Sequence, residues 1–239
     1  MSKNIVVFDF DETLGYFKDI GLFWYALNKY KKKVLYKDFY ILMELFPHIF
    51  RPLIYKILEY LKDAKLNNKC DDVLIYTNNQ APKLWCELIV NYLNNKINYV
   101  LIKKIINSFE INNKLNKGDK HSKNIKELLK YGNININTKL CYIDDTHYPL
   151  MNSDNVLYIK VKPYKYPLNI KDICSKYYNS ILKTSSINIS KNGFIEIISN
   201  NILKSKRSNN IKMKSKEELN IDKIVSKQIL QNLKNFLDD

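Results

Sequence analysis

The most informative segment of the sequence reads Ile5-Val6-Val7-Phe8-Asp9-Phe10-Asp11-Glu12-Thr13-Leu14. A short run of β-branched and aromatic residues closed by polar ones predicts a strand buried on both faces, as in a parallel sheet. In open α/β sheets the chemistry lies where such strands end, at the carboxyl edge. Asp9 and Asp11 stand at that end of the run. A buried pair of acids needs a shared proton or a cation, and a divalent metal ion suits oxygen ligands.

Other apolar runs also end in polar residues and are separated by segments of helical periodicity. These runs are residues 72–77, 140–143 and 156–161. Strands that alternate with helices predict an α/β fold, a doubly wound, Rossmann-like parallel sheet flanked by helices. Because the carboxyl ends of such strands share one crevice, we expect Asp9 and Asp11 to meet Thr77 and Asp144-Asp145 there.

The connecting segments carry weaker local signals. Residues 98–106 are ambiguous between strand and helix, and the polar residues 112–121 are predicted as a loop. Ser122 is expected to cap a helix that begins at Lys123, with Gly132 at its end. Pro52 fits the first position of another helix, where its missing N–H costs nothing.

The pattern predicts a domain over residues 1–180 and a Lys/Asn-rich extension over 181–239. Within the domain, the aromatic-rich residues 15–50 are expected to form a small helical cap or insert after the first strand. In the extension, a polar linker at about 199–216 precedes an amphipathic helix at about 217–237. That helix could dock on the core, pair with another chain or bind a partner.

The chain has 239 residues and a formal net charge of +15. A basic balance leaves nucleic acid open as a partner. The excess is dispersed lysine accompanied by abundant asparagine and isoleucine, which favours a compositional origin over a binding surface. The four cysteines lack C-x-x-C spacing, which disfavours zinc or disulfides and suits a reducing compartment. With no secretion leader and no run of about 18 apolar residues, we expect an intracellular protein that is neither secreted nor in a membrane.

The acids and the threonine at the strand ends suit phosphoryl transfer. A carboxylate fixed at a strand tip, as Asp9 would be, can attack phosphorus and form an aspartyl-phosphate. Asp11, in the following loop, could protonate the leaving oxygen and later deprotonate water. Asp144 offers a further carboxylate for a metal ion, and Thr77 can hold a phosphoryl oxygen. A lysine in the site would neutralise the developing charge.

This order of motifs resembles the haloacid dehalogenase (HAD) superfamily of phosphohydrolases. The motifs read Phe8-Asp9-Phe10-Asp11-Glu12-Thr13-Leu14, then Leu74-Ile75-Tyr76-Thr77-Asn78, then Lys123, then Tyr142-Ile143-Asp144-Asp145. The resemblance covers roughly residues 3–165.

Within the superfamily, further sequence motifs resemble those of the phosphatases related to NLI-interacting factor and to the RNA polymerase II C-terminal-domain phosphatase. These motifs are the sequence DETL after the first strand, Arg51-Pro52 before a helix, and the IYTN strand. Uncharacterised members from large DNA viruses share a DDxxHP-like segment and a later PY segment, here Asp144 to Pro149 and Pro163-Tyr164.

The resemblance implies a magnesium-dependent phosphatase with Mg2+ held by Asp9, the Asp11 carbonyl and Asp144, with Asp145 beside them or as a ligand. Asp9 would be the nucleophile and Asp11 the acid and base, and Thr77 and Asn78 would bind phosphate. The family also has an active-site lysine that takes part in catalysis and binds phosphate. The best candidate for it is Lys123, followed by Lys126 and then Lys120.

The resemblance implies that the substrate is phosphoserine or phosphothreonine in a protein. The expected compartment is the cytoplasm or nucleus, which would be that of the host cell if the protein is viral. One alternative is a phosphatase of nucleic-acid 3′ ends or nucleotides, motivated by the charge of +15. The other is a non-catalytic interaction module that keeps the fold. Salt dependence of substrate binding would separate the first alternative from the protein phosphatase.

Overall fold

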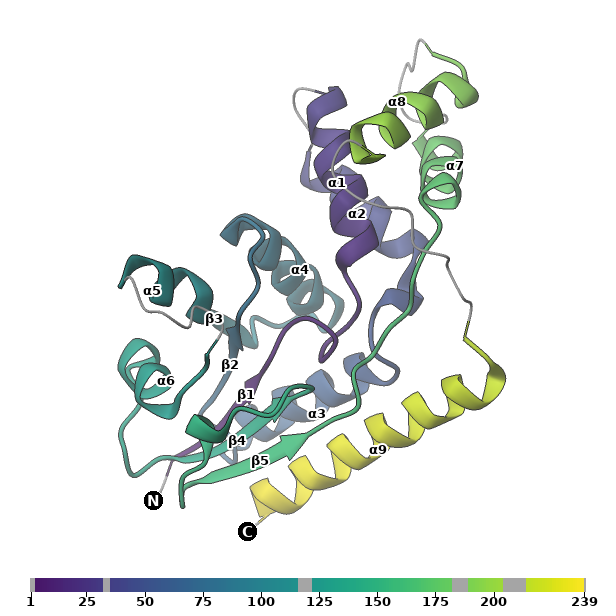
Figure 1. The fold of residues 1–239 in the computed structure, drawn as a ribbon. Coiled ribbons are helices and arrows are strands. Elements are labelled where there is room, and N and C mark those ends of the chain that lie inside the picture. The colour runs from purple at the N-terminus through teal and green to yellow at the C-terminus, as the bar shows by residue number, and fades with distance from the viewer. Residues whose placement is uncertain (1–2, 32–34, 116–121, 182–188, 204–213, 239) are drawn as a thin grey trace. The chain divides into compact units, whose positions relative to one another are not determined.

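A computed structural model describes residues 3–31, 35–115, 122–181, 189–203 and 214–238 (Figure 1). The chain divides into two compact units, which are described separately. The sheet unit comprises Met1–Gly15, Arg51–Tyr164 and Lys216–Asp239, and the helical unit comprises Tyr16–Phe50 and Lys165–Ser215. The expected boundary after residue 180 is therefore wrong, because the predicted insert packs with the helices that follow Lys165, while the terminal helix belongs to the sheet unit.

The sheet unit contains one parallel sheet of five strands in the order β3-β2-β1-β4-β5 (Figure 1). This arrangement confirms the predicted doubly wound α/β fold. The first strand lies at its centre, with Val7 opposite Leu74 on one side and Tyr142 on the other. The strands are β1 (Asn4–Phe8), β2 (Asp72–Thr77), β3 (Ile102–Asn107), β4 (Lys139–Asp144) and β5 (Val156–Lys160).

Helices connect these parallel strands. Right-handed crossovers from β1 to β2 to β3 put α3 and α4 on one face of the sheet, and the return from β3 to β4 puts α6 on the other. Short helices, α5 and the 3-10 turn η2, complete the connections. Their bounds are α3 (Ile54–Leu66), α4 (Lys83–Lys96), α5 (Ser108–Lys114), α6 (Ile125–Gly132) and η2 (Pro149–Met151).

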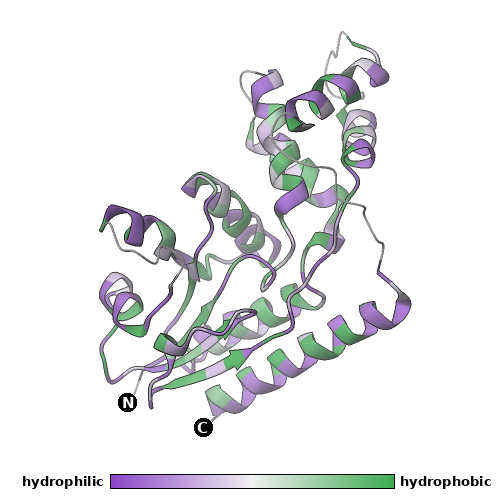
Figure 2. Cartoon of the chain, viewed as in Figure 1, coloured by the Kyte–Doolittle hydropathy of each residue, from purple (hydrophilic) through white to green (hydrophobic). Residues whose placement is uncertain are grey.

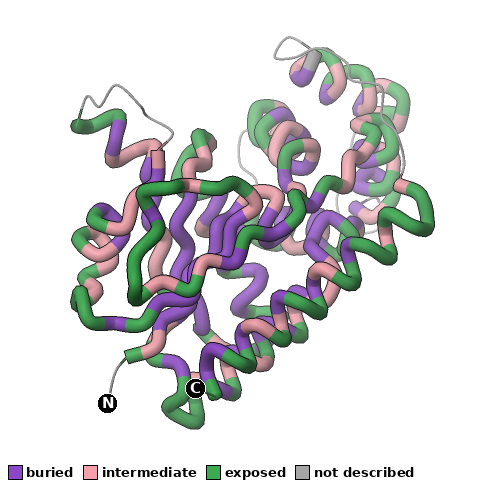
Figure 3. The backbone as a smooth tube through the Cα atoms, turned by 60° about the horizontal axis from the view of Figure 1, so that its bottom comes forward, coloured by how far each residue is buried: buried purple, intermediate pink, exposed green. Residues whose placement is uncertain are grey.

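The central strands form the core, as their apolar runs require. Figure 3 shows them as the buried middle of the unit. On the α6 face, Val7, Leu74, Tyr76 and Tyr142 pack with Leu128. The four cysteines are buried and free, which agrees with the absence of a disulfide pattern.

Helix α9 (Lys216–Asp238) docks on the core of the sheet unit, beside α3. Figure 2 shows that it has a hydrophobic and a hydrophilic side. Its apolar side buries Ile229, Leu233 and Phe236, whereas Ile224 near its start is exposed. Of the roles considered for the terminal helix, docking on the core is thus the one observed.

The helical unit consists of α1 (Lys18–Lys31), α2 (Tyr36–Leu45), η1 (Pro47–Ile49), α7 (Ile170–Ile181) and α8 (Lys191–Leu203). Aromatic contacts join them, for example between Phe23 of α1 and Tyr177 of α7, whose ring centroids are 5.2 Å apart. The carboxylate of Asp38 in α2 accepts hydrogen bonds from Lys31 at 2.9 Å and from the Tyr177 hydroxyl at 2.8 Å. The predicted aromatic insert is therefore helical.

Several local predictions need correction. Residues 108–114, partly predicted as loop, form α5, because Asn107 caps a helix there by accepting a hydrogen bond from the Glu110 N–H. Helix α6 begins after Asn124, whose side chain accepts from the Glu127 N–H at 2.8 Å, and not after Ser122.

Two further helix ends differ from expectation. Pro52 precedes α3, which starts after Leu53 in the left-handed conformation (φ 61°). Helix α8 extends to Leu203, into the predicted polar linker, and residues 204–213 lie outside the described part of the chain. None of the described helices combines the length and apolar character that crossing a membrane requires.

Candidate active site

Asp9 directly follows the central strand β1. Its backbone N–H donates to the carbonyl of Ile143 at 2.8 Å, so the backbone stays fixed one residue beyond the strand. The side chain is 6% exposed. The predicted nucleophile is therefore held rigidly at the carboxyl edge of the sheet.

Lys123 is buried between two carboxylates. Its Nζ lies 2.5 Å from Asp9 Oδ1 and 2.7 Å from Asp144 Oδ2, and the residue is 1% exposed. The rings of Tyr76, Tyr142 and Tyr148 surround the ammonium, with centroids 5.6, 5.8 and 5.2 Å away. These rings exclude water from the ion pairs while adding favourable cation–π attraction.

The structure distinguishes among the lysines considered from the sequence. Lys123 reaches the acids because it lies in the turn before α6, next to the cap residue Asn124. Lys126 is one turn further on and exposed. Lys120 lies outside the described residues.

Asp144 is the last residue of β4, the strand next to β1, and Asp145 follows it. Asp144 is 1% exposed and accepts hydrogen bonds from the Tyr142 hydroxyl and, at 2.8 Å, from the Thr146 N–H. The Thr13 hydroxyl links Asp145 to the loop after β1, donating to Oδ1 at 3.2 Å and accepting from the Asp145 N–H at 3.1 Å. Carboxylate oxygens of Asp9, Asp144 and Asp145 lie within 4.8 Å of one another.

These carboxylates form a candidate metal centre. The predicted ligands were Asp9, the Asp11 carbonyl and Asp144, with Asp145 beside them or as a ligand. The side chain of Asp145 lies in the same group as those of Asp9 and Asp144. The Asp11 side chain is not part of this group among the residues that the structure describes.

Asp11 faces the same cavity from the loop. Its Oδ2 accepts a hydrogen bond from Asn79 Nδ2 at 2.5 Å. The carbonyl of Asn79 in turn accepts from Asn107 Nδ2 at 2.8 Å. Sequence reasoning missed Asn79, although it belongs to the polar run Thr77-Asn78-Asn79 that closes β2.

Thr77 and Asn78 occupy the end of β2. Thr77 is 1% exposed, and its Oγ1 accepts a hydrogen bond from the Asn79 N–H at 3.0 Å. Asn78 Nδ2 donates to the Tyr148 hydroxyl at 3.1 Å. The predicted site residues Asp9, Asp11, Thr77, Asn78, Asp144 and Asp145 line one cavity of about 260 Å3 together with Glu12, Asn79, Thr146 and Tyr148.

Burial sets the protonation behaviour of the acids. It raises the pKa of Asp9, and the charge of Lys123 opposes this rise. Burial also raises the pKa of Asp11, with the Asn79 hydrogen bond acting in the other direction. For Asp145, burial and the neighbouring Asp144 raise the pKa to about 6.

Lys123 keeps its proton. Burial lowers its pKa, but the charges of Asp9 and Asp144 outweigh burial, so the pKa is raised overall. The centre of Asp9, Asp144 and Lys123 is thus one negative charge in excess when both acids are ionised. A divalent cation would compensate this excess, and carboxylate oxygens are its preferred donors.

Arg51 anchors the loop that carries Asp11. It is 1% exposed and donates to the carbonyl oxygens of Thr13 at 2.5 Å, Glu12 at 2.7 Å and Lys162 at 2.8 Å. Glu12 itself has a positive φ of 60°, a conformation that costs energy for a residue with a side chain. Arg51 therefore stabilises a strained turn immediately after the catalytic candidates.

Comparisons of the chain with profiles of protein families, with curated protein sequences and with solved structures find no match.

Proposed function

We propose that the protein is a magnesium-dependent phosphomonoester hydrolase that works through an aspartyl-phosphate on Asp9. The observation that carries this proposal is the buried ammonium of Lys123 between the carboxylates of Asp9 and Asp144, at 2.5 and 2.7 Å. A simple structural ion pair would need one acid. Here a second acid and an open cavity lined by Asp11 accompany it.

In the first step a carboxylate oxygen of Asp9 attacks phosphorus while the bond from phosphorus to the leaving oxygen breaks. Asp11 gives its proton to that oxygen, so the substrate leaves as an alcohol. The raised pKa of Asp11 favours the protonated form that this role requires. Lys123 offsets the negative charge that develops at the phosphoryl group.

In the second step Asp11, now ionised, takes a proton from a water molecule. The resulting oxygen nucleophile attacks phosphorus, and the bond between phosphorus and Asp9 breaks. Inorganic phosphate is released, and both acids return to their starting states. Asn79 holds Asp11 in place for both proton transfers through its hydrogen bond of 2.5 Å.

The candidate metal centre fits Mg2+, because its donors are carboxylate oxygens in a site with excess negative charge. Asp9, Asp144 and Asp145 would hold the ion. When bound, Mg2+ supplies charge neutralisation for the nucleophile and the phosphoryl oxygens.

The proposed substrate is phosphoserine or phosphothreonine in a protein, on the basis of the motif resemblance. The net charge of +15 motivates a second candidate substrate, phosphate at a nucleic-acid 3′ end. Substrate binding would then weaken steeply as salt rises, because phosphate contacts release counterions. A protein substrate held by few charges gives a shallower dependence.

Hydrolysis of an aryl phosphate tests the proposal. The wild-type protein should turn over the substrate with Mg2+ and stop with EDTA. Asp9→Asn should be inactive, and Asp154→Asn, at an exposed aspartate, serves as the matched control. Equal rates for wild type and Asp9→Asn would refute the proposal.

A further inference from the structure

The sheet has an open edge at β3, which is the last strand on its side. In the part of the chain that the structure describes, no strand pairs with the outer edge of β3. At its start, Asn94 takes the place of a neighbouring strand, accepting from the N–H groups of Leu101 and Ile102 and donating to the Ile102 carbonyl. Beyond this cap, residues 103–107 present their outer edge.

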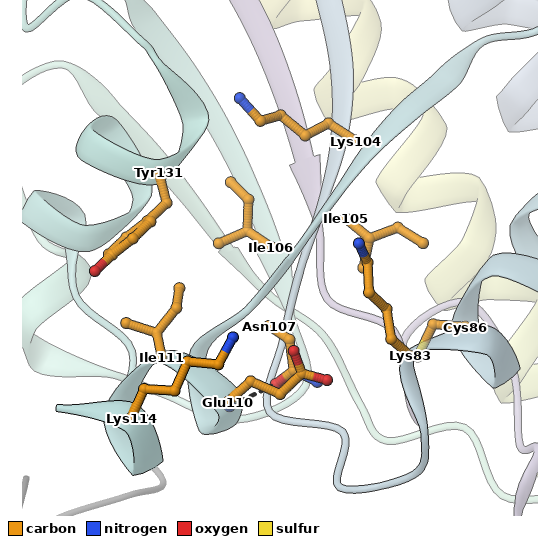
Figure 4. A pocket seen from close by; sticks show the side chains of 10 residues that line it. All are labelled: Lys83, Cys86, Lys104, Ile105, Ile106, Asn107, Glu110, Ile111, Lys114 and Tyr131. Atoms are coloured by element: carbon orange, nitrogen blue, oxygen red, sulfur yellow. Dashed lines mark hydrogen bonds between the residues drawn. The ribbon is translucent and has the colours of Figure 1, made fainter. Parts of the chain in front are cut away.

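A groove of about 200 Å3 runs along this edge and is lined by the consecutive β3 residues 104–107 (Figure 4). Figure 4 shows Lys83 and Cys86 of α4 on one side of the strand, and Ile111, Lys114 and Tyr131 on the other. Its walls are thus helical and its floor is strand. This shape suits an extended chain, since an added strand lies about 4.8 Å from its neighbour.

The groove is basic. Lys83, Lys104 and Lys114 line it, against a single acid, Glu110. Lys83 and Lys114 are exposed. Lys83 also lies 3.5 Å from Glu87 of the same helix, but solvent screens this exposed ion pair, so a ligand can compete for the ammonium. Lys104 donates to the Gly132 carbonyl at 2.7 Å, which fixes its ammonium beside the strand. An occupant with negative side chains matches this charge distribution.

The groove adjoins the candidate active site. Asn107 lines the groove, and its Nδ2 donates to the carbonyl of Asn79 at 2.8 Å. Asn79 lines the catalytic cavity and holds Asp11. Because parallel β3 ends at the same carboxyl edge as β1, a segment along β3 leads to the side of the sheet where Asp9 lies.

We propose that the open edge of β3 docks an acidic, extended segment of a phosphoprotein substrate by strand addition. Main-chain hydrogen bonds to residues 103–107 would supply affinity, and Lys83 and Lys114 would select acidic side chains. This inference rests on the proposed function for the identity of its occupant as substrate. The docking itself requires no catalysis.

Binding is tested with a fluorescent peptide in which glutamates alternate with valines and threonines, measured by anisotropy. The variant Lys83→Glu/Lys114→Glu should weaken binding roughly tenfold or more, because it reverses two charges at the rim. Lys56→Glu/Lys227→Glu makes the same change in net charge at exposed lysines elsewhere in the sheet unit. This control should bind like wild type. Equal losses in both double variants would overturn the proposal.

Hydrogen exchange supplies a readout that charge attraction alone would not move. Bound peptide should slow amide exchange within residues 103–107. Methylation of alternate peptide nitrogens should abolish binding, because it removes strand hydrogen bonds. Unchanged exchange at β3 would overturn strand addition. Competition by single-stranded DNA of equal charge, equally sensitive to Lys83→Glu/Lys114→Glu, would overturn the peptide as occupant.

Catalysis separates this inference from the proposed function. With a phosphoserine in the same peptide, Lys83→Glu/Lys114→Glu should lower kcat/KM roughly tenfold and leave aryl phosphate hydrolysis unchanged. Peptide binding without any phosphatase activity would refute the proposed function alone. Aryl phosphate hydrolysis without peptide binding would refute the docking site alone.

Discussion

Replacing Lys123 by methionine tests the charge balance at the core of the candidate site. The side chain keeps its approximate length but loses the ammonium that lies 2.5 Å from Asp9 and 2.7 Å from Asp144. At an effective dielectric constant of about 20, each ion pair at these distances represents roughly 6 kcal/mol of gross attraction. Burial of the three groups offsets most of it, and removal of one partner from a buried pair costs about 3–5 kcal/mol net.

We expect the free energy of unfolding of Lys123→Met to fall by about 5 kcal/mol, near the upper end of this range, because the ammonium pairs with both carboxylates. In EDTA the melting temperature of Lys123→Met should fall by roughly 10–15 °C relative to wild type. Protonation of Asp9, whose pKa burial already raises, limits the loss. The exposed Lys126→Met, in the same segment, should melt like wild type.

Magnesium should partly restore the stability of Lys123→Met. When Asp9 and Asp144 are both ionised, the variant has one more uncompensated negative charge than wild type, so it should gain more stability from Mg2+. Differential scanning fluorimetry in EDTA and in increasing Mg2+ measures both effects. A Lys123→Met protein as stable as wild type in EDTA, or an equal gain from Mg2+ in both, would refute this account of the site.

Other substitutions probe the elements around the site. Arg51→Met should lower stability by about 3 kcal/mol, because buried carbonyls lose hydrogen bonds to a charged donor, and should reduce kcat through the loop that carries Asp11. An unchanged melting curve would contradict the anchoring role. Leu233→Ala, fully buried in α9, should cost about 2–5 kcal/mol in urea unfolding, whereas the exposed Ile224→Ala should change stability by less than about 0.5 kcal/mol. In the helical unit, burial raises the pKa of Asp38, but hydrogen bonds from Leu35, Lys31 and Tyr177 outweigh it and lower the pKa below 3.8. Asp38 thus contributes stability above pH 3.8 that is lost as the pH falls through its lower folded pKa, so the deficit of Asp38→Asn should be constant near neutrality and shrink in acid. If the stability deficit of Asp38→Asn grew on acidification, the folded-state pKa of Asp38 would be raised and not lowered.

Four of the five strands could be read from the sequence because each is a short apolar run that ends in polar residues. Strand β3 stayed ambiguous because Lys103 and Lys104 interrupt its apolar residues. A parallel strand that is buried on both faces requires apolar residues at nearly every position, so its sequence is easily recognised. The position of Asp9, Thr77 and Asp144 at one edge follows from the same rule. Lys123 was instead ranked first on the motif resemblance, and the structure places it just before α6, in the connection that leaves this edge after β3.

The contacts that hold the site were harder to predict. Asn79 fixes Asp11 from another strand end, and one asparagine among many gives no local signal. Arg51 reaches its three carbonyl partners through a loop whose path depends on tertiary packing. The side-chain role of Asp145 likewise depends on the Thr13 hydroxyl, across 132 residues of sequence.

The division of the chain could not be read from composition. The aromatic insert and the segment after Lys165 are separated by more than a hundred residues, yet their helices bury each other's apolar faces. Periodicity shows that a helix has an apolar side but not which helix covers it. The same limit applied to α9, whose docking partner α3 the sequence left open.

Under the proposed function, Asp9 becomes phosphorylated during turnover. Asp11→Asn should accept the phosphoryl group from an aryl phosphate, whose leaving group needs little protonation, but should lack the base that activates water. The intermediate should therefore accumulate. Mass spectrometry after reduction with borohydride should find homoserine at position 9 in this variant, and unmodified protein in Asp9→Asn. The account would be contradicted if wild type turned over the aryl phosphate while Asp11→Asn carried no homoserine at position 9. Homoserine at another position would contradict it as well.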